Sequence, residues 1–263
     1  MAELFIDQAK EYAKGRPKYP KALYNFIASK TPAFDLAWDV GTGNGQAAES
    51  LSTTYKNVVA TDTSEKQLEL APKLPNVRYL KTPPLMTMSE LEKTVSAQST
   101  VDLVTVAQAL HWFDLPEFYR QAKWVLKKPN GVIAAWTYSL PAVNDSVDAV
   151  FVSFYKNVSA PFWEPERILV EEMYNTIDFP FIPVEGEDTT GPFTFVSQVV
   201  KDLDSFLMHI RSWSAYQTAK KKGIELLTEE RLRIFQRAWN EDGLEEKIVK
   251  YTVFLKIGRV GYL

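Results

Sequence analysis

The chain has 263 residues, of which 46% are hydrophobic and 24% are charged, a composition that indicates a folded globular protein and excludes a disordered or fibrous one. Its 33 acidic and 30 basic residues give a net charge of −3, so no basic field favours a nucleic acid or an anionic membrane surface. The absence of cysteine excludes disulfides, thiolate metal sites and cysteine nucleophiles, and leaves His111 and His209 as bases at neutral pH.

The first thirty residues predict two short amphipathic helices on either side of a kink. Apolar residues recur at helical spacing within 4–12 and again within 23–27, and the segment GRPKYP at 15–20 separates them. Charged residues interrupt the apolar ones from the N-terminus onward, and no apolar run approaches the roughly 18 residues of a membrane-spanning helix. We therefore expect a cytoplasmic protein with no membrane partner.

Short apolar runs then alternate with longer amphipathic stretches, as in an α/β protein with a parallel sheet. The expected strands are Leu36–Val40, Asn57–Thr61, Val77–Leu80, Val101–Val106 and Gly131–Trp136. Before the last of them, apolar residues from Leu115 to Val125 line one helical face, and Asp114 with Glu117 forms the pattern of an N-terminal capping box. This segment predicts the crossover helix between two parallel strands.

The second half of the chain differs in composition from the first. Residues 141–190 are rich in aromatic residues and prolines and lack the alternation of strand and helix, which indicates an insertion. A strand over Phe193–Val199, a helix over Leu203–Arg211 and a helical face ending at Trp239 follow, and 250–257 alternates as a strand with one polar face. We expect an α/β fold with about seven strands in a single domain. Its parts would be an N-terminal helical lid (1–30), a ligand-binding half (34–140), an insertion or lid (141–190) and a segment that completes the sheet (191–263).

A glycine-rich turn follows the first expected strand. Gly41, Gly43 and Gly45 let the backbone turn tightly and approach a ligand, and the helix that follows presents unpaired N–H groups to an anionic part of it. Seventeen residues beyond Gly45, Asp62 follows the second expected strand, where its carboxylate can accept hydrogen bonds from two ribose hydroxyls. The two features together predict a nucleotide-like ligand.

The spacing of the glycines separates two classes of nucleotide-binding protein. Dinucleotide oxidoreductases use G-x-G-x-x-G, whereas here Gln46 stands where their third glycine belongs, so a pyrophosphate fits poorly. An acid, Asp39, followed by G-x-G-x-G and by Asp62 after the second strand resembles the signature of class I S-adenosylmethionine-dependent methyltransferases. The resemblance implies the fold of that class, a Rossmann-like three-layer sandwich, mostly parallel with an antiparallel C-terminal strand, here with a helical lid.

The resemblance extends to the small-molecule branch called methyltransferase type 11, and especially to its trans-aconitate methyltransferase-like members. The matching segments are YAKGRPKYP (12–20), VDLVTVAQALHWFDLPEFY (101–119), NGVIAAW (130–136), RSWSAY (211–216) and FLKIGR (254–259). The resemblance therefore covers the chain from residue 12 to about 136, with further matches near 211 and at the C-terminal strand.

S-adenosylmethionine is the cofactor that this resemblance implies, with S-adenosylhomocysteine as the product. Carried over by position, Gly41–Gln46 would hold its methionine part, Asp62 its ribose and Thr63 an edge of its adenine. The implied cofactor-binding residues are Asp39, Gly41, Thr42, Gly43, Gly45, Gln46, Asp62, Thr63, Ala107, Gln108 and Ala109. One departure concerns the adenine: many relatives carry an acid after the third strand, whereas this chain has KTPPL at 81–85.

The acceptor is expected to meet one histidine, two arginines and several aromatic residues. Methyl transfer from a sulfonium is an in-line displacement, which needs alignment and no metal. His111 directly follows the fourth strand, at the edge where ligands bind, and it can be a base, a group that positions the acceptor, or a packed histidine. An arginine fork can bind a carboxylate in a bidentate manner. The expected acceptor-binding residues are Tyr12, Arg16, Tyr19, Trp112, Trp163, Arg211, Trp213 and Tyr216.

Several functions remain open at this point. The leading interpretation is methylation of a carboxylate oxygen of a small organic acid, an acceptor that is already ionised at pH 7. The runner-up is methylation of an oxygen or nitrogen of an aromatic metabolite with His111 as the base. A non-catalytic module that binds a protein through its aromatic insertion is a third interpretation, and the glycine spacing disfavours a nicotinamide-dependent oxidoreductase. The basic run at 220–222 lacks interleaved aromatic residues, so no nucleic-acid partner is expected, and the oligomeric state is left open.

Overall fold

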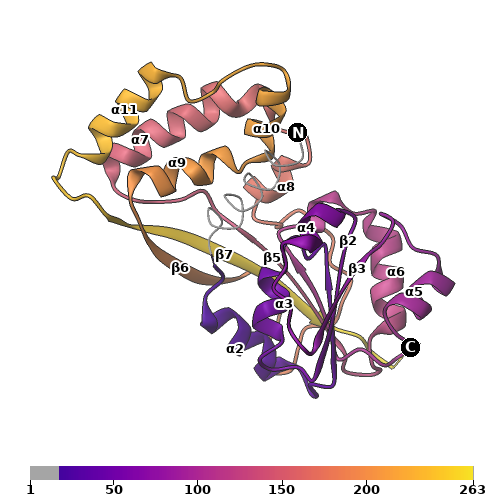
Figure 1. Ribbon diagram of the computed structural model, residues 1–263. Coiled ribbons are helices and arrows are strands. Elements are labelled where there is room, and N and C mark those ends of the chain that lie inside the picture. The colour runs from indigo at the N-terminus through magenta and orange to yellow at the C-terminus, as the bar shows by residue number, and fades with distance from the viewer. Residues whose placement is uncertain (1–17, 263) are drawn as a thin grey trace. The chain divides into compact units, whose positions relative to one another are not determined.

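A computed structural model describes residues 18–262 of the chain (Figure 1). The first predicted helix, together with Tyr12 and Arg16, lies outside these residues. The chain divides into two compact units. The sheet unit consists of residues 19–139, 168–195 and 253–262, and the helical unit consists of residue 18 with 140–167 and 196–252. The expectation that the whole chain is one domain stays a prediction.

Seven strands form one mixed sheet in the order β3-β2-β1-β4-β5-β7-β6. The strands are β1 (Leu36–Val40), β2 (Asn57–Asp62), β3 (Val77–Lys81), β4 (Leu103–Ala107), β5 (Val132–Tyr138), β6 (Phe193–Lys201) and β7 (Lys247–Arg259). The first five pair in parallel, and β7 runs antiparallel to β5 with Trp136 opposite Leu255. The predicted strands and the antiparallel C-terminal strand are thus confirmed, except that Val101 precedes β4 and forms an isolated bridge with Leu126.

Helices connect the strands of the sheet unit and make up most of the helical unit. In the sheet unit they are α2 (Lys21–Lys30), α3 (Gln46–Leu51), α4 (Glu65–Glu69), α5 (Met88–Thr94), the 3-10 turn η1 (Leu110–Trp112) and α6 (Leu115–Val125). The short helix α8 (Arg167–Glu171) begins at the boundary of the two units. The helical unit holds α7 (Asp145–Ser153), the π-helical turn η2 (Phe154–Ser159), the 3-10 turn η3 (Ala160–Phe162), α9 (Leu203–Arg211), α10 (Ser214–Lys221) and α11 (Glu229–Trp239).

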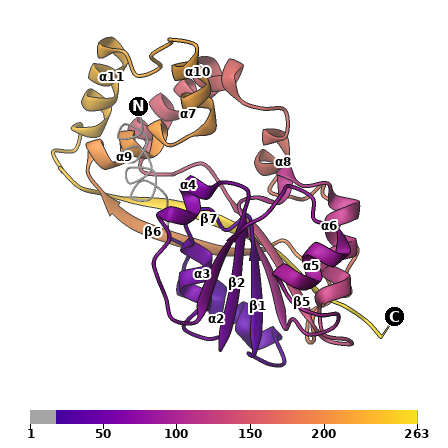
Figure 2. The ribbon, with the colours of Figure 1, turned by 45° about the vertical axis from the view of Figure 1, so that its right-hand side comes forward.

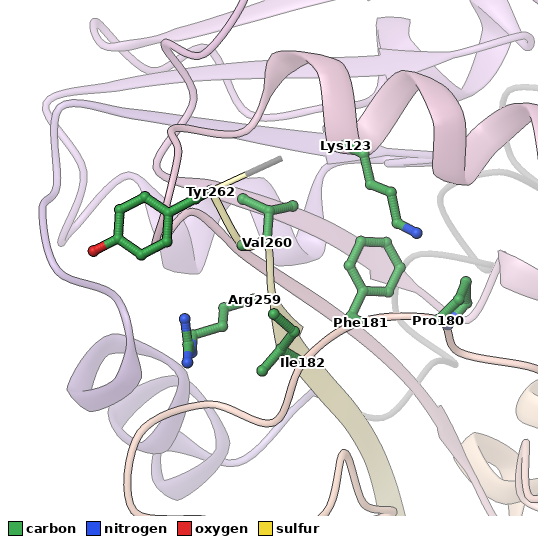
Figure 3. A pocket seen from close by; sticks show the side chains of 8 residues that line it. Lys123, Pro180, Phe181, Ile182, Arg259, Val260 and Tyr262 are labelled. Carbon is green, nitrogen blue, oxygen red and sulfur yellow. The ribbon is translucent and has the colours of Figure 1, made fainter.

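Both faces of the parallel sheet are covered by helices (Figure 2). Helices α5 and α6 lie on one face, and α2 and α3 lie on the other. Alternate strand residues, such as Val104 and Val106, share a buried cluster with Phe118 and Ala122 of α6, as the period of two along a strand requires. Coverage on both faces explains why β1, β2, β4 and β5 are almost continuously apolar.

The parallel pairing determines where a ligand can bind. Because β1 lies between β2 and β4 and is parallel to both, the carboxyl ends of these three strands meet at one edge of the sheet. The segments 41–45, 63–64 and 108–109 begin at that edge. Ligands of open parallel sheets bind outside the carboxyl ends of the strands, so the expected cofactor-binding residues gather where the fold predicts a site.

The helical unit has an aromatic core of its own. The ring of Phe151 in α7 packs edge-on against Phe206 and Trp213, with ring centroids 5.6 and 5.5 Å apart. Asn144 begins α7, since its side chain accepts a hydrogen bond from the backbone N–H of Val147 (3.0 Å). The insertion expected at 141–190 is therefore helical at its start, which its aromatic and proline-rich composition did not predict.

The N-terminus of α6 differs from the expected capping box. Asp114 caps the helix by accepting a hydrogen bond from the backbone N–H of Glu117 (3.2 Å), as predicted. The carboxylate of Glu117 binds the guanidinium of Arg120 (2.8 Å), a cation within reach one turn further on, so the reciprocal half of the box is wrong. A complete capping box stands instead at α5, between Thr87 and Glu90.

Among residues 18–262, no helix is long and apolar enough to span a membrane.

Candidate active site

The glycine loop between β1 and α3 is built from three residues in the left-handed backbone region. Gly41, Gly43 and Gly45 have φ angles of 66°, 57° and 83°, which side-chain-bearing residues rarely adopt. A Cβ atom on Gly41 would lie 2.8 Å from the Cβ of Ala109, and one on Gly45 would lie 2.7 Å from the hydroxyl of Tyr79. Close packing thus also demands glycine at these two positions.

Gly43 differs from the other two glycines because its side-chain position is open. The nearest atom to a Cβ placed there is the Oε1 of Gln67, at 4.0 Å. Packing against the protein therefore does not explain this glycine. An open position at the centre of the loop is where the backbone can approach a bound ligand closely.

Asp39 is a fully buried carboxyl group that ties the loop to the neighbouring strand. It accepts hydrogen bonds from the hydroxyls of Thr42 (2.5 Å) and Thr105 (2.7 Å). Burial raises the pKa of Asp39 to about 6, although the two hydroxyls oppose that shift. Both oxygens of Asp39 are engaged within the protein, so this carboxyl group holds the loop in shape.

Asp62 ends β2 and lies against the middle of the glycine loop. One carboxylate oxygen accepts a hydrogen bond from the backbone N–H of Gly43 (2.8 Å), and the other accepts one from the N–H of Ser64 (2.8 Å). A carboxylate oxygen can accept more than one hydrogen bond, so this orientation leaves capacity for hydroxyl donors. Thr63, the neighbour expected to meet the adenine, is exposed, and Gln46 is half-buried as the first residue of α3.

The end of β4 forms the other side of the site. The backbone N–H of Gln108 donates to the carbonyl of Trp136 (2.8 Å), and its side-chain oxygen accepts from the hydroxyl of Thr137 (2.9 Å) and the N–H of Tyr138 (3.1 Å). Gln108 also has a left-handed φ of 57°. The side chain of Gln108 is thus directed to β5, and it holds the half-buried backbone of Ala107–Ala109 in place beside Gly41.

Two buried polar atoms around the loop test whether a polar ligand fits. Within the described part of the chain, the Tyr79 hydroxyl and the Gln67 Oε1 have no hydrogen-bond partner. Buried polar atoms are nearly always hydrogen-bonded, and both of these atoms lie beside glycines of the loop. The lining therefore suits a ligand with its own donors and acceptors, such as a nucleoside joined to an amino acid.

His111 lies in the turn η1, directly after this edge of the sheet. Its Nδ1 atom is 2.9 Å from the hydroxyl of Tyr174, and its ring lies 4.8 Å from that of Trp112, centroid to centroid. His111 is 9% exposed, whereas Trp112 is 51% exposed. The ring of Phe113 in the same segment approaches Gly41, so η1 packs directly against the glycine loop.

The expected acceptor-binding residues fall into separate groups. Tyr19 belongs to the sheet unit, where its ring contacts those of Trp136 (5.4 Å) and Tyr138 (6.4 Å). In the helical unit, the rings of Trp163 and Trp213 lie 5.4 Å apart. These two tryptophans thus share one aromatic cluster, and their role toward the acceptor stays a prediction.

Tyr216 and Arg211 have partners inside the helical unit. The hydroxyl of Tyr216 donates to the Glu225 carboxylate, and burial together with this carboxylate raises the pKa of Tyr216. The carbonyl of Arg211 accepts a hydrogen bond from the side chain of Gln217 (2.8 Å). The second contact links the end of α9 to α10, and the first ties α10 to the segment that follows it.

Sequence reasoning did not find Arg167, which begins α8. Its guanidinium lies over the ring of Trp163 at 4.5 Å, and its Nε donates to the hydroxyl of Tyr155 (3.0 Å). Tyr174 and Tyr79 were missed as well. None of the three stands in a recognisable motif, and only the fold brings them to their partners.

No group of side chains among residues 18–262 is arranged to hold a metal ion.

Comparisons with known proteins agree with this geometry. A family model described as a methyltransferase domain matches residues 38–135, the segment from β1 to β5. A methyltransferase-family protein of Dictyostelium discoideum is 31% identical over 257 residues, which are 95% of this chain and 92% of that protein. CRG1 of Saccharomyces cerevisiae, named as an S-adenosylmethionine-dependent methyltransferase, is 26% identical over 80% of this chain and 79% of its own length.

A solved structure of similar fold comes from Anaeromyxobacter dehalogenans. This type II methyltransferase-family protein superposes with a TM-score of 0.78 and 31% identity, over 94% of this chain and 99% of its own. Fold, glycine loop and relatives together define a class I S-adenosylmethionine-dependent methyltransferase with a Rossmann-like fold. Within that class, the chain belongs to the methyltransferase type 11 family, and its cofactor is S-adenosylmethionine. Its membership of the trans-aconitate methyltransferase-like subgroup stays a prediction.

Proposed function

We propose that this enzyme methylates a small molecule, and that the acceptor is a carboxylate oxygen of a small organic acid, as in trans-aconitate methyltransferase-like proteins. The quoted resemblance at 12–20 and 211–216 supports this subgroup. The absence of a broad basic field, with a net charge of −3, argues against a nucleic-acid acceptor. The proposal makes positioning, rather than acid–base chemistry, the main task of the protein.

The residues at the carboxyl edge of the sheet fit the cofactor. S-adenosylmethionine supplies a methyl group activated by a positively charged sulfur. We assign the loop Gly41–Gln46 to its methionine part, Asp62 to its ribose hydroxyls and Thr63 to an edge of its adenine. Support comes from the open side-chain position at Gly43 and the orientation of the Asp62 carboxylate toward that glycine.

A carboxylate acceptor needs a cation and no base, because its pKa of about 4 leaves it ionised at neutral pH. The observation that carries this part of the proposal is the state of Arg167. Its planar guanidinium rests on Trp163, and its Nε is held by Tyr155, so its fork is oriented before any ligand binds. We add Arg167 to Arg16 and Arg211 as a candidate ligand of the carboxylate.

Methylation of an aromatic or heterocyclic metabolite is the second candidate. It would require His111 as a base, and the hydrogen-bonding distance between His111 and Tyr174 favours a histidine with a defined orientation. The exposed ring of Trp112 next to His111 could stack on such an acceptor.

Three alanine variants separate the two candidates. With an organic acid as the acceptor, Arg167→Ala or Arg211→Ala is expected to raise its KM about tenfold or more, because a charge-assisted hydrogen bond is lost. Arg233→Ala is the matched control, since Arg233 is an exposed arginine of the same unit that pairs only with Glu229 among the described residues. Loss of activity confined to His111→Ala, with both arginine variants unaffected, would instead support the aromatic acceptor.

A further inference from the structure

Tyr174 connects the segment 168–195 to the catalytic edge of the sheet. Its side chain is fully buried, and its hydroxyl is 2.9 Å from Nδ1 of His111. It belongs to the same buried cluster as Phe118 of α6 and Val106 of β4. The sequence analysis treated this part of the chain as an insertion, yet it packs into the core of the sheet unit and reaches the one histidine of the site.

The backbone at this position is held in an unfavourable conformation. Met173 and Tyr174 have φ angles of 58° and 59°, and neither is a glycine. Hydrogen bonds on both sides close the turn: the N–H of Tyr174 donates to Leu169 (2.9 Å), and its carbonyl accepts from Ile177 (3.2 Å). Strained backbone of this kind persists only where the surrounding structure maintains it, and it concentrates at functional sites.

The orientation of His111 is fixed from two sides. The ring of Trp112 lies against it at 4.8 Å, and the Tyr174 hydroxyl engages Nδ1. The partner of one ring nitrogen determines which nitrogen carries the proton in a neutral imidazole. The hydrogen bond between Tyr174 and Nδ1 therefore bears on whether Nε2 of His111 carries a proton.

We propose that Tyr174 is a positioning residue that donates its hydroxyl proton to Nδ1 and holds neutral His111 with its own proton on Nε2. A phenol, with a pKa of about 10, is the natural donor in such a pair, and a neutral imidazole nitrogen, with a pKa of about 6.5, is the natural acceptor. The hydrogen bond is then Oη–H to Nδ1, and no proton leaves either group. Nε2 of His111 then carries an N–H bond, which can donate to an oxygen but cannot accept a proton.

This arrangement selects a class of acceptor. An N–H group at Nε2 can hold an ionised oxygen, such as that of a carboxylate, but it cannot remove a proton while the nitrogen already carries one. The inference rests on the proposed function, which it deepens: His111 positions an acceptor that needs no base. It also assigns a task to Tyr174 in the methyltransferase site.

Nitrogen NMR tests the inference without any acceptor. The chain contains only two histidines, so protein labelled with ¹⁵N-histidine gives two imidazole spectra, which His111→Gln assigns. At about two pH units above the ordinary histidine pKa of about 6.5, we expect the Nε2–H tautomer at His111. Tyr174→Phe is expected to shift the Nδ1 signal and to populate the other tautomer, while His209 stays unchanged.

Tyr119→Phe is the matched control for the loss of a buried hydroxyl. The hydroxyl of Tyr119 donates to the carbonyl of Asp178 (2.9 Å) in the same unit, and not to His111. This variant is expected to leave both histidine spectra unchanged. An Nδ1–H tautomer in the wild-type protein, or a His111 spectrum that Tyr174→Phe does not alter, would overturn the proposal. Since the wild-type tautomer is read directly, a variant that folds poorly does not weaken the test.

A kinetic measurement adds a second, independent result. With an organic acid as the acceptor, Tyr174→Phe is expected to lower kcat about tenfold and to leave the affinity for S-adenosylmethionine unchanged, since Tyr174 binds His111 and packs in the core of the sheet unit. If no organic acid is methylated by the wild-type enzyme, the proposed function fails, while the NMR result still decides the role of Tyr174. If acids are methylated and Tyr174→Phe is as active as Tyr119→Phe, the positioning role is contradicted.

Discussion

Asp62 joins the second strand to the glycine loop, and it is the residue that we assign to the ribose of the cofactor. Its carboxylate already receives hydrogen bonds from the N–H groups of Gly43 and Ser64, so its orientation does not depend on a ligand. A carboxylate oriented in advance loses little conformational entropy when it binds hydroxyl groups. Asp62 is therefore the position where a small change is expected to have a large effect on cofactor affinity.

We expect Asp62→Ala to weaken S-adenosylmethionine binding by about tenfold or more, because up to two hydrogen bonds to a charged oxygen are lost. Isothermal titration calorimetry measures the change, and circular dichroism verifies that the variant is folded. Asp35→Ala is the control, since Asp35 is an exposed aspartate of the same unit paired with Lys56 and Lys127. Equal affinities of wild type and Asp62→Ala would refute the assignment of Asp62 to the ribose.

The stability of the folded chain is expected to depend on pH through Asp39. Its pKa in the folded chain is raised to about 6, mainly by burial, and an unfolded aspartate titrates near 3.9. Between these two values the folded chain keeps a proton that the unfolded chain has released. The contribution of Asp39 to the free energy of unfolding therefore falls as pH rises from about 4 to about 6. Above that range the buried carboxylate is ionised, and the loss of stability is complete.

Asp39→Asn removes this titration. Relative to wild type, the variant is expected to gain stability as pH rises from about 4 to 7, by no more than about 3 kcal/mol for a shift of about two pKa units. Urea unfolding of both proteins at several pH values gives the difference in the free energy of unfolding. A difference that is independent of pH would show that Asp39 does not titrate in this range.

At the scale of elements, the loop after β1 and the loop after β4 pack against each other at Gly41 and Ala109. We expect Gly41→Ala to destabilise the protein by about 2 to 4 kcal/mol, through left-handed strain and overpacking against the Ala109 Cβ, 2.8 Å away. Ala109→Gly removes that Cβ, so the double variant should recover part of the loss. Chemical denaturation of the four proteins gives the coupling energy.

The cycle has a control within the same loop. Gly43→Ala has open space for its Cβ, so its cost is expected to come from the φ of 57° alone, at about 1 to 2 kcal/mol, and Ala109→Gly should not relieve it. If Gly41→Ala and Ala109→Gly are simply additive, the two loops are not in the contact described.

The elements that sequence predicted well are those whose signal is local. The strand over 36–40 and the helix over 203–211 have the bounds expected from apolar runs and helical spacing. Helix α7 was missed because prolines and aromatic residues around it dominated the composition, although Val147 and Phe151 have helical spacing. The turn at the end of β1, near which the expected cofactor-binding residues gather, was predicted because a strand and a glycine turn can both be recognised from neighbouring residues.

The parts of the candidate site that could not be predicted depend on contacts between residues far apart in the sequence. Tyr174 lies 63 positions from His111 in the sequence. Arg167 contacts Tyr155 through a cation–π interaction and a hydrogen bond, and no sequence motif indicates either contact. Contacts of this kind depend on how whole segments pack. The position of His111 after the fourth strand could be predicted from the sequence, whereas only the structure brings Tyr174 to it.

At the scale of the whole molecule, the residues expected to bind the cofactor and several of those expected to bind the acceptor belong to different units. The sheet unit holds the expected cofactor residues from Asp39 to Ala109, and the helical unit holds Trp163, Trp213 and the two arginines 167 and 211. In the helical unit, the rings of Trp163 and Trp213 share one aromatic core, and the guanidinium of Arg167 lies over Trp163.

The most direct test of the central claim is transfer of a labelled methyl group from S-adenosylmethionine to organic acids, with trans-aconitate among them. We expect a labelled product that releases methanol in base, as a methyl ester does, and a strongly reduced yield with Asp62→Ala. A labelled product that is stable to base, formed from an aromatic acceptor while no acid is methylated, would contradict it.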